Sequence, residues 1–113
     1  MGRERVALRP QASDALAALG AQVRVARQGQ SFTIEDLANR AAVSPRTVSN
    51  IERGSGAVAA GNLFNVAVAA GVDLFGTSDP THLSLIAARL RASAAAGRAR
   101  VMPPRDGGDQ DDF

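Results

Sequence analysis

The chain has 113 residues, of which 45% are apolar and only 4% aromatic, so it is one small domain with tails, with a core built from alanine, valine, leucine and isoleucine. It has no cysteine, which excludes disulfides and thiol chemistry. Residues 1–105 carry thirteen arginines and seven carboxylates, a formal charge of +6, whereas residues 106–113 carry four aspartates. The basic body favours a polyanionic partner, although an ordinary arginine-rich surface would have the same composition.

The first twelve residues are predicted to form an arm outside the folded core. Three arginines surround the short apolar run at residues 6–8, so an arm that contacts DNA, a disordered start and a strand through this run all stay open. The charge of this segment argues against a signal peptide. The uncharged stretch 54–72 has too many glycine, serine and asparagine residues for a transmembrane helix. We therefore expect a cytoplasmic protein without a membrane partner.

Two helices are predicted in the first third of the chain. Apolar residues recur at helical spacing from Leu16 to Ala26, which predicts a helix over about 13–28 with Ser13 as its N-cap. A second, short helix is predicted over about 33–41. Thr33 and Asp36 have nearly the spacing of a capping box at its start, with aspartate in place of glutamate.

The third predicted helix, over about 45–53, has a polar outward face. Ser44 is a favoured N-cap, Pro45 suits the first helical position, and Gly54 suits the left-handed position after a helix. Val48 and Ile51 are expected to face inward. The polar residues that remain are the candidate DNA contacts, namely Ser44, Arg46, Thr47, Ser49, Asn50 and Arg53.

Two more helices are predicted, over about 61–70 and from Pro80 to about residue 96. In the last one, Leu83, Ile86 and Leu90 form an apolar stripe that exceeds the needs of a four-helix core, which indicates a dimer interface. Residues 98–104 fit a short strand, and residues 105–113 have the composition of a disordered tail. The prediction is an all-α, compact five-helix bundle with domain bounds 13–96, an arm at 1–12 and an extension at 97–113.

The second and third helices have the layout of a helix-turn-helix unit. They are short, a turn of three to four residues joins them, and the later helix is amphipathic. In such a unit the first helix braces the second, which enters the major groove with its N-terminal end toward the bases. Arg46 at that end can pair with guanine, and Asn50 on the same face can pair with adenine. Plain architecture or a protein-docking surface is the alternative.

The segment LANRAAVSPRTVSNIERG, residues 37–54, resembles the lambda-repressor/Cro type of helix-turn-helix, often called the Xre family. The resemblance covers residues 13–72 without gaps. It implies that Ser44, Thr47 and Arg53 lie toward the DNA backbone, whereas Arg46 and Asn50 read bases. It also implies a buried ion pair, between Arg27 and Glu52, that joins the first and third helices.

The chain departs from that family at three places. Ile34 stands where the family often has glutamine, so one phosphate or base contact is expected to be missing. Ala42 stands where the turn usually has glycine, which costs about 1 kcal/mol if its backbone is left-handed. The loop at residues 54–60 has no cation, so phosphate binding there would rely on backbone N–H groups at the start of the fourth helix.

Other chemistry is not expected. His82 is the only histidine and has no cysteine or carboxylate cluster beside it in the sequence. The acidic run at 106–112 lacks the spacing of a calcium loop, and the glycines at 54–56 follow a helix, unlike those of a phosphate loop. The prediction is no enzyme, no cofactor and no metal.

The C-terminal tail ends with Asp111, Asp112 and Phe113. Its composition and spacing look similar to antitoxin-type regulators of the HipB kind, which implies a HipA-like kinase as partner, with the two aspartates steering and Phe113 anchoring. An inert solubilising tail and weak competition with DNA stay open.

We therefore expect a sequence-specific repressor or autoregulator that binds double-stranded DNA as a homodimer. The alternative is an antitoxin or adaptor that binds and restrains a partner protein.

Overall fold

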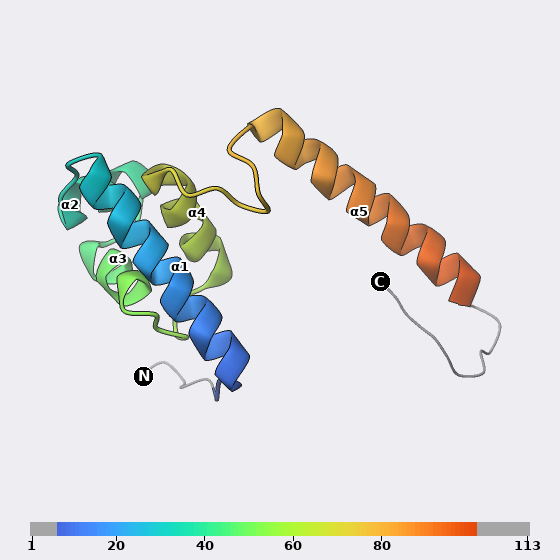
Figure 1. The fold of residues 1–113 in the computed structure, drawn as a ribbon, viewed down its shortest axis with the longest axis horizontal. Coiled ribbons are helices and arrows are strands. Elements are labelled where there is room, and N and C mark those ends of the chain that lie inside the picture. Colours follow the sequence, from blue (N-terminus) through green and yellow to red (C-terminus); the bar gives the residue numbers. More distant parts are fainter. Residues whose placement is uncertain (1–6, 102–113) are drawn as a thin grey trace. The chain divides into compact units, whose positions relative to one another are not determined.

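The computed structural model describes the backbone of residues 7–101 and the side chains of residues 7–97. The described residues form five α-helices and no named strand (Figure 1), which confirms the predicted all-α class. The helices are α1 (Pro10–Gly29), α2 (Ile34–Ala41), α3 (Pro45–Glu52), α4 (Ala60–Ala70) and α5 (Pro80–Val101). The chain divides into two compact units, Met1–Ser78 with α1 to α4 and Asp79–Phe113 with α5.

The core of the first unit is aliphatic, as the composition predicts. α2 packs against α3 and α4, and α1 packs against the same two helices (Figure 1). Among the described residues, the buried core has no aromatic side chain; its members are Val23, Leu37, Ala38, Ala41, Val48, Ile51, Val66, Ala67 and Ala70. Small side chains on α2 and α4 let these short helices approach one another closely. The core thereby fixes the angle at which α3 stands on the domain surface.

The crossing of α1 over the end of α3 depends on Gly20. This residue is buried, and a methyl group on it would overlap the carbonyl oxygen of Ile51 and lie 3.1 Å from that of Glu52. The absence of a side chain at Gly20 therefore lets the backbones of the two helices come into contact. This contact sets the position of the C-terminal end of α3.

The start of α1 differs from the sequence prediction. The helix begins at Pro10 with Arg9 as its N-cap, so Ser13 lies inside the helix and the prediction that it caps α1 was wrong. Proline is favoured at the first helical position because its missing N–H would have no partner there. The first turn of α1 thus includes three residues of the expected arm.

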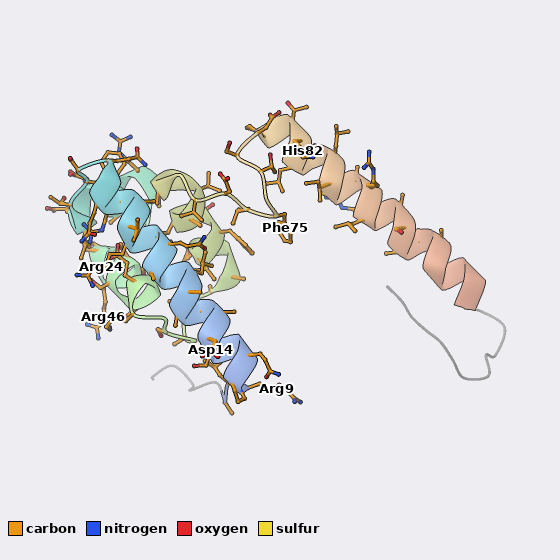
Figure 2. The ribbon with its side chains drawn as sticks, in the orientation of Figure 1. Arg9, Asp14, Arg24, Arg46, Phe75 and His82 are labelled. Carbon is orange, nitrogen blue, oxygen red and sulfur yellow. The ribbon has the colours of Figure 1, made fainter. Side chains whose placement is uncertain are left out.

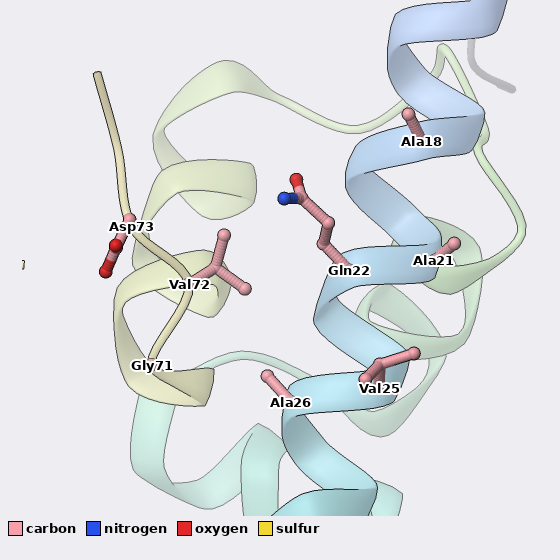
Figure 3. A pocket seen from close by; sticks show the side chains of 8 residues that line it. All are labelled: Ala18, Ala21, Gln22, Val25, Ala26, Gly71, Val72 and Asp73. Atoms are coloured by element: carbon pink, nitrogen blue, oxygen red, sulfur yellow. The ribbon is translucent and has the colours of Figure 1, made fainter. Parts of the chain in front are cut away.

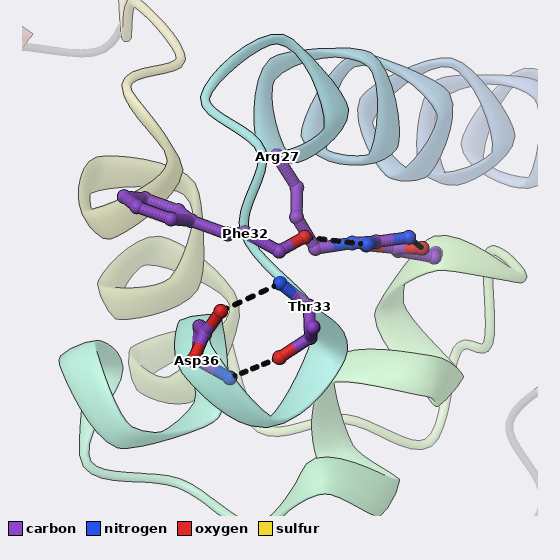
Figure 4. Close-up of polar contacts among 5 residues, drawn as sticks. Arg27, Phe32, Thr33 and Asp36 are labelled. Carbon is purple, nitrogen blue, oxygen red and sulfur yellow. Dashed lines mark hydrogen bonds and ion pairs between the residues drawn. The ribbon is translucent and has the colours of Figure 1, made fainter.

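The other helix ends follow their local signals. Thr33 and Asp36 form the predicted capping box, with the Thr33 N–H donating to Asp36 Oδ2 and the Asp36 N–H donating to Thr33 Oγ1, both at 2.9 Å (Figure 4). The hydrogen bond from the Thr33 N–H lowers the pKa of Asp36 below its usual value, and the hydrogen bond with the Thr33 side chain lowers it further. At the far end of α4, Gly71 is left-handed with φ 92°, and Gln30 Nε2 donates to the Ala70 carbonyl at 2.5 Å. The end of α1 is thereby tied to the end of α4.

The second unit is described up to the end of α5. Asp79 Oδ1 accepts the Thr81 N–H at 3.0 Å, and Pro80 follows as the first helical residue. The helix continues to Val101, so the strand expected at 98–104 was wrong for 98–101, because alanine and arginine sustain a helix. Residues 1–6 and 102–113 lie outside the described residues, and with them the predictions for Asp111, Asp112 and Phe113.

None of the helices in residues 7–101 combines the length and apolar character that a bilayer-spanning segment needs. The same residues hold no cluster of three or more histidine, cysteine or carboxylate side chains that could bind a metal ion.

Candidate nucleic-acid interface

The turn between α2 and α3 reverses the chain through a left-handed residue. Ala42 has φ 59° and ψ 44°, and the Val43 N–H donates back to the Ala38 carbonyl at 3.0 Å. Ala38 is fully buried, which allows α2 and α3 to pack closely at the turn. The turn therefore has the geometry that a glycine would adopt without strain, and here an alanine adopts it.

The start of α3 is fixed by its own side chains. Ser44 Oγ accepts the Thr47 N–H at 3.1 Å, and the two hydroxyl oxygens lie 3.0 Å apart. Ser44 is thus a helix cap as predicted, and its oxygen is already engaged within the protein. Val48 and Ile51 face the core with at most 2% of their surfaces exposed. Any contact that Ser44 makes with DNA would add to this capping role.

The outward face of α3 holds Arg46, Asn50 and Arg53 at spacings of four and three residues, so they lie along one side of the helix. Arg46 is exposed and projects from the surface of α3 (Figure 2). Asn50 is partly buried, and its Oδ1 accepts a hydrogen bond from Arg53 Nη2. The pattern in the sequence placed these residues on one face, but it did not indicate that Asn50 and Arg53 bond to each other.

Four of the six candidate contacts line one cavity of about 320 Å³. They are Ser44, Arg46, Thr47 and Asn50, and the rest of the lining consists of Ala57, Val58, Ala59 and Asn62. Ser49, which is partly buried, and Arg53 are not part of this lining. The structure therefore joins the start of α3 to the loop before α4.

Asn62 was not predicted from the sequence. It lies in the first turn of α4, whose N-cap Ala59 has no side-chain hydrogen bond to the helix. An uncapped helix start leaves backbone N–H groups available and carries a partial positive charge. An asparagine within an uncharged, alanine-rich stretch gave no signal of its own, because only the fold brings it opposite Thr47 and Asn50.

A bidentate ion pair holds the other end of α3. Arg27 Nε lies 2.6 Å from Glu52 Oε2, and Arg27 Nη2 donates to Glu52 Oε1 at 3.1 Å. A third donor of Arg27, Nη1, reaches the Phe32 carbonyl at 2.9 Å (Figure 4). The hydrogen bond to Glu52 raises the pKa of Arg27 against the opposing effect of burial. One side chain thus connects α1, the chain before α2 and the end of α3.

A second cavity, of about 510 Å³, lies between α1 and the residues after α4 (Figure 3). Its lining is mostly small and apolar, with Gln22 and Asp73 as the polar members and Val25 and Val72 as the largest apolar side chains. Helical spacing places Ala18, Gln22 and Val25 on one side of α1. Gly20 and Arg27 lie on the opposite side, where they contact the end of α3. None of the candidate DNA contacts lines it.

The charge of the first unit is smaller than the +6 of residues 1–105 suggests. Residues 1–78, which make up the first unit, contain eight arginines and six carboxylates, a formal charge of +2. Residues 79–113, which make up the second unit, contain five arginines and five aspartates, a formal charge of zero. The +6 of residues 1–105 is therefore divided into +2 on the first unit and +4 on residues 79–105, and the four aspartates of residues 106–113 offset the latter.

A family model described as "Helix-turn-helix domain" matches residues 18–85, which is more than half of the chain. The match includes all of α2, α3 and α4 together with the cavity lining described above. A search of curated proteins found no match. The chain belongs to the helix-turn-helix domain family, a family of DNA-binding domains.

Proposed function

We propose that this protein is a sequence-specific transcriptional regulator of the Xre type that acts as a repressor or autoregulator and reads the major groove of double-stranded DNA with α3. The observation that carries the proposal is the shared cavity, which brings Arg46 and Asn50 beside the uncapped start of α4. Base-reading side chains and a backbone-binding helix end are the two kinds of contact that a DNA reader needs.

The division of roles follows from where each group lies. Arg46, exposed at the N-terminal end of α3, has the reach and the donors for guanine O6 and N7. A phosphate of the adjacent strand would lie against the first N–H groups of α4, with the Asn62 amide and the Thr47 hydroxyl at the same cavity. This arrangement would replace the cations that the loop at 54–60 lacks.

The weak net charge of the first unit bears on how the protein would find its site on DNA. Each phosphate neutralised by an arginine adds about one unit to the salt slope of binding. With a formal charge of only +2, the first unit would contribute little long-range attraction, so nonspecific affinity would come mainly from the five arginines of residues 89–105. Specificity would come from α3 and nonspecific attraction from these five arginines.

We further propose that the active form is a homodimer. α3 has eight residues and is about 12 Å long, enough for only a few base pairs. Adequate affinity therefore calls for two half-sites about 34–36 Å apart, or a multiple of that distance. In the apolar stripe of α5, Leu90 is 60% exposed and Leu83 and Ile86 are partly buried; the exposed Leu90 supports the second unit as the contact between copies.

The experiment is an electrophoretic mobility shift with DNA from upstream of the protein's own gene. We expect a complex that survives excess shuffled competitor of the same composition and that contains two protein chains by light scattering. Equal competition by the shuffled DNA would contradict sequence-specific binding, and a monomeric complex would contradict the homodimer.

The alternative function is that of an antitoxin or adaptor, and it depends on the acidic tail. Asp111, Asp112 and Phe113 would dock on a partner protein such as a HipA-like kinase. A variant lacking residues 106–113 separates the two functions. Loss of the partner in a pull-down with DNA binding intact would support docking, whereas unchanged capture would leave the tail without that role.

A further inference from the structure

The cavity of Figure 3 runs along one side of α1, and we call it the α1 groove. Its wall on α1 consists of Ala18, Ala21, Gln22, Val25 and Ala26. Gly71, Val72 and Asp73 form the other wall, and Gln22 and Val72 project into the groove from opposite sides (Figure 3). Val25 is 69% exposed although it is apolar. The small side chains of the lining thus leave space for larger apolar groups.

α5 has a stripe of large apolar side chains that matches the groove in length. Leu83, Ile86 and Leu90 follow one another at spacings of three and four residues, so they lie on one side of the helix. Leu83 and Leu90 are seven positions apart, about 10 Å along a helix. Ala18 and Val25 of the α1 groove have the same separation. The stripe therefore suits the groove in the way that an amphipathic helix binds an apolar groove.

The charges beside the stripe and in the groove have opposite signs. Within residues 80–97 the side chains with a formal charge are Arg89 and Arg91, and helical spacing places them on the two flanks of the stripe. Asp73 is the charged member of the groove lining, and it is exposed. Pairing of α5 with another α5 would bring the arginines together without a carboxylate in residues 80–97, which is unfavourable. Pairing with the α1 groove brings an arginine beside an aspartate.

We propose that α5 of one copy binds in the α1 groove of a second copy, with the stripe on the groove lining and an arginine of α5 beside Asp73. The arrangement is reciprocal, because a two-fold dimer repeats each contact, so two helices fill two grooves. The inference rests on the proposed homodimer and names its interface. None of the candidate DNA contacts lines the groove, so an occupied groove leaves the outward face of α3 uncovered.

The experiment is cysteine crosslinking in the full-length protein, which has no cysteine of its own. Gln22→Cys places a thiol in the groove and Ile86→Cys places one in the stripe. The two variants are co-expressed with different affinity tags, so that mixed dimers form, and are then treated with a short bis-maleimide. We expect a crosslinked dimer that carries both tags, severalfold more abundant than the crosslink of either variant alone. Ser13→Cys, on the opposite side of α1, replaces Gln22→Cys as the control and should show no such increase.

Each other occupant of the groove gives a different result. Ile86→Cys alone crosslinking as strongly as the mixture assigns α5 to a second α5 and overturns the inference. A link within one chain of the Gln22→Cys/Ile86→Cys double variant, without a dimer band, assigns the groove to the chain's own helix and also overturns it. A dimer by light scattering without increased crosslinking in the mixture overturns the inference alone, whereas a monomer at micromolar concentration overturns the proposed homodimer as well. Sequence-specific DNA binding is tested separately by the mobility shift.

A second set of variants tests the charge arrangement by analytical ultracentrifugation. Asp73→Arg should raise the dissociation constant of the dimer roughly tenfold, because it places like charges at both contacts of the dimer. Glu35→Arg, the same charge change on α2 and outside the groove lining, is the control, and circular dichroism checks that both variants fold. Adding Arg89→Asp and Arg91→Asp to Asp73→Arg should restore the dimer. Equal dissociation constants for Asp73→Arg and Glu35→Arg overturn the placement of α5 in the groove.

Discussion

Arg27 and Glu52 are joined by two hydrogen bonds, of 2.6 and 3.1 Å, although 25 positions separate them in the chain. Their side chains are 12% and 8% exposed, so the pair is largely shielded from water. Because Arg27 also donates to the Phe32 carbonyl, the pair links three segments at the end of α3 away from Arg46. The orientation of α3 depends on this contact.

Removing one partner of the pair should destabilise the fold. Glu52→Ala leaves the Arg27 guanidinium partly buried without its carboxylate, and we expect a loss of roughly 2–4 kcal/mol in the free energy of unfolding. The remaining exposure keeps the loss toward the lower end of the range for buried pairs. Urea denaturation measures it, with Asp14→Ala on the exposed face of α1 as the control. A Glu52→Ala curve that coincides with that of Asp14→Ala would contradict the structural role.

Gly20→Ala should destabilise the crossing of α1 and α3. The added methyl group overlaps the Ile51 carbonyl, and the two backbones must separate to admit it. Overpacking of this kind costs about 1–3 kcal/mol. Gly61→Ala is the matched control, since its methyl group would meet no atom within 4 Å. Gly61→Ala should be neutral or slightly stabilising, and equal melting temperatures for the two variants would refute the close crossing.

Ala42→Gly should stabilise the protein. Relief of the left-handed strain at Ala42 is worth about 1–2 kcal/mol, and the greater freedom of glycine in the unfolded chain offsets about 0.4–1 kcal/mol of it. The net gain is about 0.5–1 kcal/mol. In contrast, Ala18→Gly in the middle of α1 should cost about 1 kcal/mol. If both variants lower the melting temperature by the same amount, the turn is not strained.

The capping box of α2 should make stability depend on pH. The folded-state pKa of Asp36 is lowered by its bonds to Thr33, so its contribution is present above the unfolded pKa of about 3.9 and is lost as pH falls through the folded value. Asp36→Asn keeps an acceptor oxygen but does not titrate. The wild type should melt higher than this variant at pH 6, and the difference should shrink below about pH 4. A difference that stays constant from pH 6 to pH 2 would rule out this linkage.

Local signals predicted the helix order and most helix ends. The Thr33 capping box, the Ser44 N-cap and the left-handed Gly54 each depend on neighbouring residues in the sequence, and the structure has all three. The start of α1 and the length of α5 were misjudged where two local signals competed. Pro10 outweighed Ser13 as a start signal, and the alanine-rich run carried α5 past residue 96 to Val101.

The parts of the site that depend on tertiary structure could not be predicted in the same way. Periodicity placed Arg46 and Asn50 on one face, but only the packing of α4 on α2 brings Asn62 to the same cavity. The bond from Arg53 to Asn50 depends on rotamers that the sequence pattern does not specify. Net charge did not indicate where the positive charge lies, since only +2 of the +6 of residues 1–105 belongs to residues 1–78.

The central claim is that α3 reads DNA, and Arg46→Ala tests it most directly. Fluorescence anisotropy compares this variant with Arg89→Ala, which removes the same charge from α5. Both are measured at one salt concentration, with the upstream DNA that the wild type binds and with a shuffled duplex. Arg46→Ala should lose roughly 1–3 kcal/mol of binding free energy on the upstream DNA and much less on the shuffled duplex, with an unchanged melting temperature. Arg89→Ala should weaken both complexes alike. Equal, uniform losses for the two variants would contradict base reading by α3.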